Sequence, residues 1–88
     1  MSPSIIRRTI LAELARSEQY ALPQEQLLTQ VNLRLRPELT MDELAKQLSW
    51  MLDRKPPMVA FLADSMEPDN AEARRWLITE AGLTQLKR

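Results

Sequence analysis

Apolar residues near the N-terminus recur three and four positions apart, which is the spacing of one side of an α-helix. This stripe consists of Ile6, Ile10, Leu11 and Leu14. The charged residues that fall largely outside it are Arg7, Glu13 and Arg16. Ser2 and Pro3 precede the stripe, and serine followed by proline in the first turn is a common helix start. We predict a first helix that ends near Ser17.

A second apolar stripe follows a short extended link over residues 20–22. Proline pushes the residue before it toward extended backbone and suits a helix start, so we expect the next helix to begin at about Pro23. Its apolar positions are Leu27, Leu28 and Val31. We predict that this helix ends at about Leu33, and that the segment 34–39 with Pro37 is a turn, because a helix interior does not tolerate proline cheaply.

The third helix has the clearest start signal in the chain. Thr40 and Glu43 have the spacing of a capping box, in which each side chain accepts a hydrogen bond from an unpaired backbone N–H. The predicted helix spans residues 40–55, and its apolar face consists of Leu44, Leu48, Met51 and Leu52. The opposite face carries Asp42, Lys46, Ser49 and Asp53. Trp50 lies on the flank of that polar face.

The last third of the chain has the pattern of a β-hairpin. The segments 58–62 and 75–79 are rich in β-formers, and the polar segment 63–74 between them, which we call the hairpin loop, holds proline, aspartate and asparagine. Trp76 lies in the second strand, where packing in the core or hairpin is the simplest role. Thr79 is placed to cap a short closing helix through Leu83 and Leu86. The predicted fold class is therefore α+β, mainly α with a small β-hairpin. The predicted order of elements is helix, short β segment, helix, helix, strand, loop, strand and helix.

The composition narrows the function classes. With 88 residues the chain has the size of one domain, which we place at residues 1–88, and its apolar content of 44% is in the globular range. We expect a cytoplasmic protein without a membrane-spanning or signal segment. Cysteine and histidine are both missing from the sequence, which removes the usual zinc ligands and the commonest general base. We predict neither catalytic activity, nor a metal site, nor a cofactor.

The order of elements and two sequence motifs resemble the winged helix-turn-helix superfamily. The stretch 67–82 is similar to the wing of the MarR-like regulators and to the Thr-Glu-x-Gly helix start that follows it. The stretch 48–53 resembles the end of the recognition helix in small bacterial and phage-type winged-helix proteins. The resemblance implies that the helix over 40–55 lies in the major groove of DNA, with the hairpin as a wing beside it.

Our first interpretation is therefore a small DNA-binding protein, a transcriptional regulator or a phage-type DNA-associated factor. Double-stranded DNA is the expected partner, and a homodimer would place two third helices in successive major grooves. The candidate DNA contacts are Arg34, Arg36, Thr40, Lys46, Gln47, Ser49, Arg74 and Arg75. Of these, Lys46 can donate to guanine and Gln47 can pair with adenine.

The charge pattern supports an alternative interpretation. The chain has a formal net charge of zero, and residues 56–73 hold four acids without a single base. These acids are Asp64, Glu67, Asp69 and Glu72. A loop of this sign repels the phosphate backbone, and the tip of the hairpin lacks the arginine that winged regulators of this type usually carry. The alternative is a protein interaction module that does not bind DNA.

The alternative interface combines the acidic hairpin with Trp50, Asp53 and Met66. An exposed tryptophan ringed by polar side chains is a common anchor of protein interfaces. Trp50 has a structural explanation as well, in which the first strand or the N-terminal region covers its ring. We expect the arginine pairs 7–8 and 74–75 to be solvated surface charges.

Overall fold

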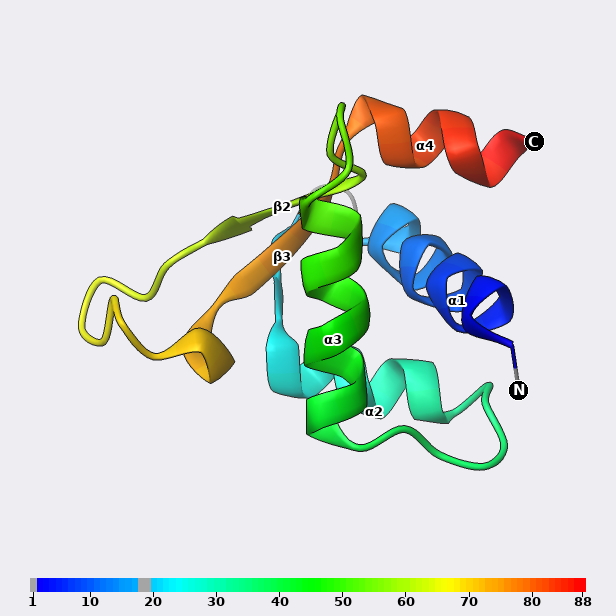
Figure 1. The fold of residues 1–88 in the computed structure, drawn as a ribbon. Helices are drawn as coiled ribbons and strands as arrows, with labels where there is room; N and C mark the ends of the chain where they lie inside the picture. The colour runs from blue at the N-terminus through cyan, green and yellow to red at the C-terminus, as the bar shows by residue number, and fades with distance from the viewer. Residues whose placement is uncertain (1, 18–19) are drawn as a thin grey trace.

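The computed structural model describes residues 2–17 and 20–88, and it contains four α-helices, one short 3-10 helix and a three-stranded antiparallel sheet (Figure 1). The elements in chain order are α1 (Pro3–Arg16), β1 (Leu22–Pro23), α2 (Gln24–Asn32), α3 (Met41–Leu52), β2 (Val59–Leu62), η1 (Ala71–Ala73), β3 (Arg75–Ile78) and α4 (Glu80–Lys87). This α+β layout is compatible with the predicted order of elements, and the helix bounds lie close to the predicted ones.

Three helices begin at the side-chain caps that the sequence predicts. The Ser2 hydroxyl accepts a hydrogen bond from the Ile5 amide at 3.4 Å, and both bonds of the capping box at Thr40 are present. The hydroxyl of Thr79 accepts a hydrogen bond from the Gly82 amide at 3.2 Å. Each cap pairs an N–H group that the first helical turn would otherwise leave unpaired.

The sheet has three strands, because the short β segment predicted before the second helix pairs with one strand of the predicted hairpin. Its order is β1-β3-β2, with Leu22 opposite Trp76 and Pro23 opposite Arg75. The short link before α2 is therefore an edge strand, a position in which proline is tolerated because one side of the strand needs no ladder bond. The Gln24 amide continues the pairing by donating to the Arg74 carbonyl oxygen at 3.0 Å. Strand β3 is consequently the central strand of the sheet.

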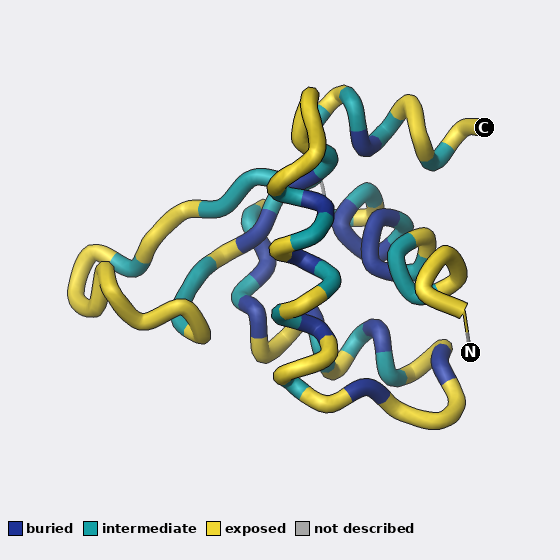
Figure 2. The backbone as a smooth tube through the Cα atoms, in the orientation of Figure 1, coloured by how far each residue is buried: buried dark blue, intermediate teal, exposed yellow. Residues whose placement is uncertain are grey.

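The core lies between the helices and the sheet, as the run of buried segments in Figure 2 shows. It takes in the predicted stripes of all three long helices, and its fully buried members include Ile10, Leu27, Leu44, Leu48 and Met51. The segment 34–39, predicted as a turn, also contributes Leu35 and Leu39 to this core. Trp76 is buried as predicted, and its ring packs against Phe61 at a centroid distance of 5.3 Å.

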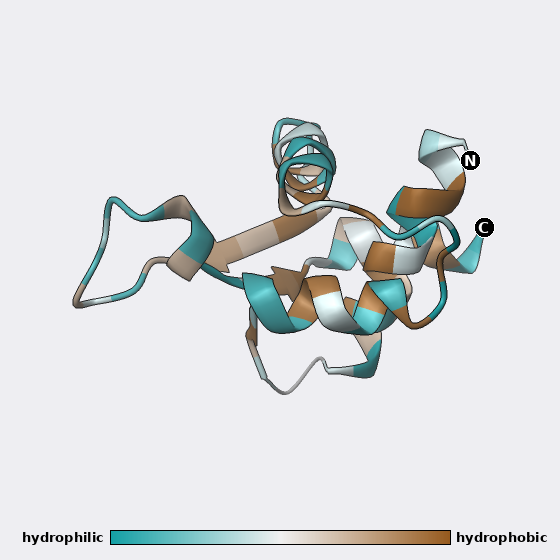
Figure 3. Ribbon diagram, turned by 90° about the horizontal axis from the view of Figure 1, so that it is seen from below, coloured by the Kyte–Doolittle hydropathy of each residue, from teal (hydrophilic) through white to brown (hydrophobic). Residues whose placement is uncertain are grey.

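The tip of the hairpin loop extends away from the helices, on the side of the molecule opposite α1, in both views of the ribbon (Figures 1 and 3), whereas η1 in its return segment contacts α2. Among the described residues, no helix combines the length and the apolar character needed to cross a membrane.

Candidate functional site

The outer face of α3 is the surface on which the DNA-binding prediction depends. The capping box fixes the start of this helix, and its helical period then turns one row of side chains to solvent. The exposed row consists of Asp42, Lys46, Ser49 and Asp53, as predicted. Two carboxylates therefore accompany one ammonium group, and the face as a whole does not attract a polyanion.

Two of the predicted DNA contacts are engaged elsewhere in the molecule. The guanidinium of Arg34 forms an ion pair with Glu13 of α1, and the Arg36 guanidinium donates to the carbonyl oxygens of Asn32 and Leu35 at 2.5 and 2.7 Å. The prediction that Glu13 lies largely outside the buried face of α1 is wrong, because this residue is only 4% exposed. A carboxylate can be buried at such a position when an arginine pairs with it.

Thr40 and Gln47 also have structural partners. The hydroxyl of Thr40 accepts the Glu43 amide at 3.1 Å, so the cap occupies an acceptor site of that oxygen. The Gln47 carbonyl oxygen accepts a hydrogen bond from Arg7 Nε of α1 at 2.7 Å. The first contact stabilises the start of α3, and the second joins α3 to α1. Both side chains therefore have fewer free hydrogen-bonding positions for a partner.

Trp50 is half-buried on the flank of α3 that faces α1. The guanidinium carbon of Arg7 lies 3.4 Å from the Trp50 ring centroid, and that of Arg54 lies 4.1 Å from it. The indole ring is thus stacked against two cations, and its other contacts reach the core. The expectation that Arg7 is a solvated charge is wrong for this reason. The cover of Trp50 comes from α1 and from Arg54, just after the end of α3, which agrees in part with the structural explanation for this residue.

The two hairpin arginines differ from each other. The Arg74 guanidinium stacks on the Phe61 ring at 4.1 Å, and its buried Nε has no hydrogen-bond partner among the described residues. Arg75 is exposed on the central strand, where it lies opposite Leu62 of β2 and Pro23 of β1. Arg74 and Arg75 thus lie at the start of β3 and contact the sheet, whereas Arg34 and Arg36 pair with groups of α1 and α2.

The hairpin loop is the most prominent exposed feature that the sequence predicted. Three of its four acids are exposed, and Met66 is 86% exposed between them. The carboxylate of Asp64 accepts the Met66 amide at 2.8 Å, and the side chain of Asn70 accepts the Glu72 amide at 3.0 Å at the start of η1. Side chains of the loop thus hydrogen-bond to its own backbone and stabilise the conformation that carries the charged groups.

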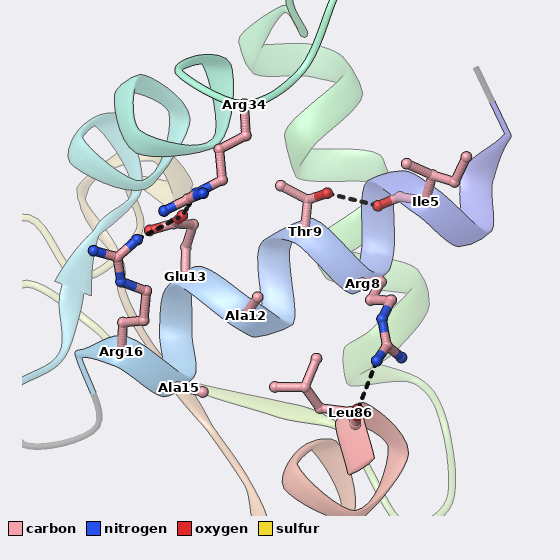
Figure 4. A pocket seen from close by; sticks show the side chains of 9 residues that line it. All are labelled: Ile5, Arg8, Thr9, Ala12, Glu13, Ala15, Arg16, Arg34 and Leu86. Atoms are coloured by element: carbon pink, nitrogen blue, oxygen red, sulfur yellow. Dashed lines mark hydrogen bonds and ion pairs between the residues drawn. The ribbon is translucent and has the colours of Figure 1, made fainter. Parts of the chain in front are cut away.

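A groove on the outer side of α1 is a feature that the sequence reasoning missed (Figure 4). It has a volume of about 630 Å³, and its lining includes Ile5, Ala12, Ala15 and Leu86. Three arginines also line it, namely Arg8, Arg16 and Arg34. The sequence does hold a signal for this groove, namely the small and apolar residues Ile5, Ala12 and Ala15 on a second side of α1. An apolar stripe does not reveal it, because alanine adds little to such a stripe.

The described residues hold no cluster of three or more side chains suited to binding a metal ion. Three candidate surfaces for a partner are the outer face of α3, the hairpin loop and the groove on α1. Comparison with protein-family models gives no match for this chain, and comparisons with curated proteins and with solved structures give none either.

Proposed function

We propose that this chain is a protein-binding module of the winged-helix type, and that the hairpin loop is its contact element. The observation that carries the proposal is the combination of an extended, braced loop, four carboxylates and a methionine that is 86% exposed at Met66. Exposed apolar side chains within a charged rim are typical of surfaces that bind proteins. The expected partner surface is basic and offers an apolar recess for Met66.

The loop is suited to binding because its shape exists before a partner arrives. In addition to the bonds at Asp64 and Asn70, the Asn70 amide donates to the Glu67 carbonyl oxygen at 3.1 Å. At the base of the loop, the stack of Arg74 on Phe61 joins its return strand to β2. A contact element that is already ordered loses less conformational entropy on binding.

Charge is the main reason to prefer a protein over DNA. In a winged-helix complex with DNA, the wing approaches the sugar-phosphate backbone, and here that wing would bring four carboxylates toward it. Of the eight predicted DNA contacts, four already have hydrogen-bond or ion-pair partners within the chain, namely Arg34, Arg36, Thr40 and Gln47. Lys46 and Arg75 are exposed without a hydrogen bond or ion pair to another described residue. Arg34 and Arg36 are exposed as well, but they offer only the donors that their partners within the chain leave over, so this set of cations gives weak affinity for a polyanion.

DNA binding is the second candidate function. It is favoured by the layout of α2, α3 and the sheet, which matches the order expected of a winged helix-turn-helix, and by the exposure of Lys46 and Ser49 on α3. A homodimer that binds two successive grooves would double this small basic set. The two candidates predict opposite outcomes in a direct binding measurement.

The first arm of the test measures DNA binding of the full chain by fluorescence anisotropy with labelled duplexes of random sequence. We expect no saturation at protein concentrations below about 10⁻⁴ M, even at about 50 mM salt. A dissociation constant in the micromolar range that weakens steeply between about 50 and 200 mM salt would instead favour the DNA-binding candidate.

The second arm selects ligands for the full chain from a random peptide library. We expect the selected peptides to combine lysine or arginine with apolar residues, and to bind about tenfold more weakly after Met66→Gln. The double variant Asp69→Asn with Glu72→Gln should lose affinity as well. Glu38→Gln with Glu80→Gln removes the same charge from two exposed acids elsewhere and should not lose affinity. Peptides that bind all of these variants equally would show that the hairpin loop is not the contact element.

A further inference from the structure

The groove on α1 has an apolar floor with a strongly basic rim. Figure 4 shows α1 crossing the view, with Arg34 approaching from the side of α2 and Leu86 from α4. Ala12 and Ala15 form part of the floor, and Ile5, which is 54% exposed, continues it toward the N-terminus. The short side chains of the alanines leave the space that the groove occupies. No described segment of the chain fills this space.

The charge of this groove is positive because three arginines surround a single carboxylate. Arg34 pairs with Glu13, Arg16 lies 3.6 Å from the same carboxylate oxygen, and Arg8 donates to the Leu86 carbonyl oxygen at 2.9 Å. The side chains of Arg16 and Arg34 remain 64% and 54% exposed, so their guanidinium groups keep donors for a further anion. The groove therefore suits a segment that carries carboxylates together with an apolar side chain.

The chain itself contains a segment of this kind. The hairpin loop carries four carboxylates and the exposed Met66, and it extends on the side of the molecule opposite α1 (Figure 1). It therefore points away from the groove of its own chain. We propose that the hairpin loop of one copy docks in the groove on α1 of a second copy, an inference that rests on the proposed function and names its partner.

The geometry of this contact determines the kind of assembly. Because the loop and the groove are different surfaces on opposite sides of the chain, the contact is heterologous, and each added copy exposes a new loop and a new groove. Such a contact produces open chains of copies, or a ring when the rotation between copies closes. Exposed ion pairs contribute much of the attraction, so the association weakens as salt shortens the Debye length from about 10 Å at 0.1 M to about 3 Å at 1 M.

The groove is best tested with Ala12→Glu. The new carboxylate lies four positions from both Arg8 and Arg16 on α1, within the spacing of a helical ion pair, and it lowers the formal charge of the groove lining from +2 to +1. Ala12→Gln has nearly the same bulk without the charge and is the matched control. The loop is tested with Asp69→Lys and Glu72→Lys together, because neither side chain makes a hydrogen bond or an ion pair among the described residues.

Sedimentation velocity of the full chain over a range of protein concentrations gives the readout. At low salt, the average mass of the wild-type protein in solution should increase with concentration above the monomer mass of 10.2 kDa. At about 1 M salt it should return to the monomer mass. The Ala12→Glu variant and the double lysine variant should each weaken association by about tenfold or more. Glu38→Lys with Glu80→Lys makes the same change in net charge at two exposed acids elsewhere and should leave the association intact.

A mixture of the two defective variants gives the sharpest result. The Ala12→Glu chain retains an intact loop, and the double lysine variant retains an intact groove, so the mixture should form a one-to-one complex that does not grow further. Association that persists in both variants, or a mixture that stays monomeric, overturns the proposed contact.

The outcome also separates this inference from the proposed function. A wild-type chain that is monomeric at every concentration and salt, but still binds selected peptides through Met66, refutes the self-association and leaves the protein-binding function in place. A monomeric chain whose hairpin loop selects no peptide refutes both.

Discussion

Replacement of Trp50 by alanine decides between a packing role and an interface role for this residue. The ring is half-buried and stacks between Arg7 and Arg54, whose guanidinium carbons lie 3.4 and 4.1 Å from its centroid. A fully buried tryptophan costs about 3–5 kcal/mol when it is truncated to alanine, so a half-buried one costs about 2 kcal/mol. Two cation–π contacts near the surface add about 0.5–1 kcal/mol each. We expect Trp50→Ala to lower the free energy of unfolding by about 3 kcal/mol.

This loss is large compared with the roughly 4–13 kcal/mol that a chain of this length has in total. Urea unfolding followed by far-UV circular dichroism should show a lower midpoint with an unchanged m-value, and the melting temperature should fall by at least about 12 °C. Arg54→Ala is the matched control, because it removes one stacked cation and should cost about 0.5–1 kcal/mol. A loss below about 1 kcal/mol for Trp50→Ala would refute the packing role and leave the ring free for a partner.

Two further substitutions test the packing of α4 and the ion pair on α1. Gly82→Ala should destabilise the chain by about 1–3 kcal/mol in thermal melts, because the added methyl carbon would lie 2.3 Å from the Met58 carbonyl oxygen; a stabilised variant would contradict this close approach. Arg34→Ala should cost about 1–3 kcal/mol in urea unfolding, since it removes the nearer partner of the buried Glu13 carboxylate. Arg16→Ala should cost clearly less, and equal losses for the two arginines would show that Glu13 does not depend on Arg34.

The helix boundaries could be predicted because their signals are local. A cap such as Thr40 needs a partner only three residues away, and the period of the helix then assigns the buried and exposed faces of α3. The sequence predicts a short β segment before α2, but its pairing with β3 could not be predicted in the same way. Its two residues, Leu22 and Pro23, carry a weak strand signal, and they become a strand because they lie against Trp76 more than fifty residues later.

The candidate sites also differ in how well they could be predicted from local sequence. The exposure of Met66 and of the acids in the hairpin loop was predictable, because an exposed side chain needs no partner. The positions of the arginines were not, because each depends on a contact with another element. Arg34 pairs with Glu13 at a separation of 21 residues, and Arg7 reaches Gln47 at a separation of 40. From the sequence alone these arginines look like free surface cations. In the folded chain they contact polar and aromatic side chains of other elements instead.

A net charge of zero therefore hides an uneven distribution of charge over the molecule. Cations concentrate around α1 and the end of α3, where several are stacked or paired, while the hairpin loop carries four acids on the opposite side. A molecule of this kind is oriented by the field of a partner even though it has no net attraction to a polyanion. Its orientation should place the loop toward positive surfaces and α1 toward negative ones. The hairpin loop is acidic and the groove on α1 is basic, so a second copy of the chain offers a positive surface to the loop and a negative one to the groove. This complementarity of charge is the reason for proposing a second copy as the partner.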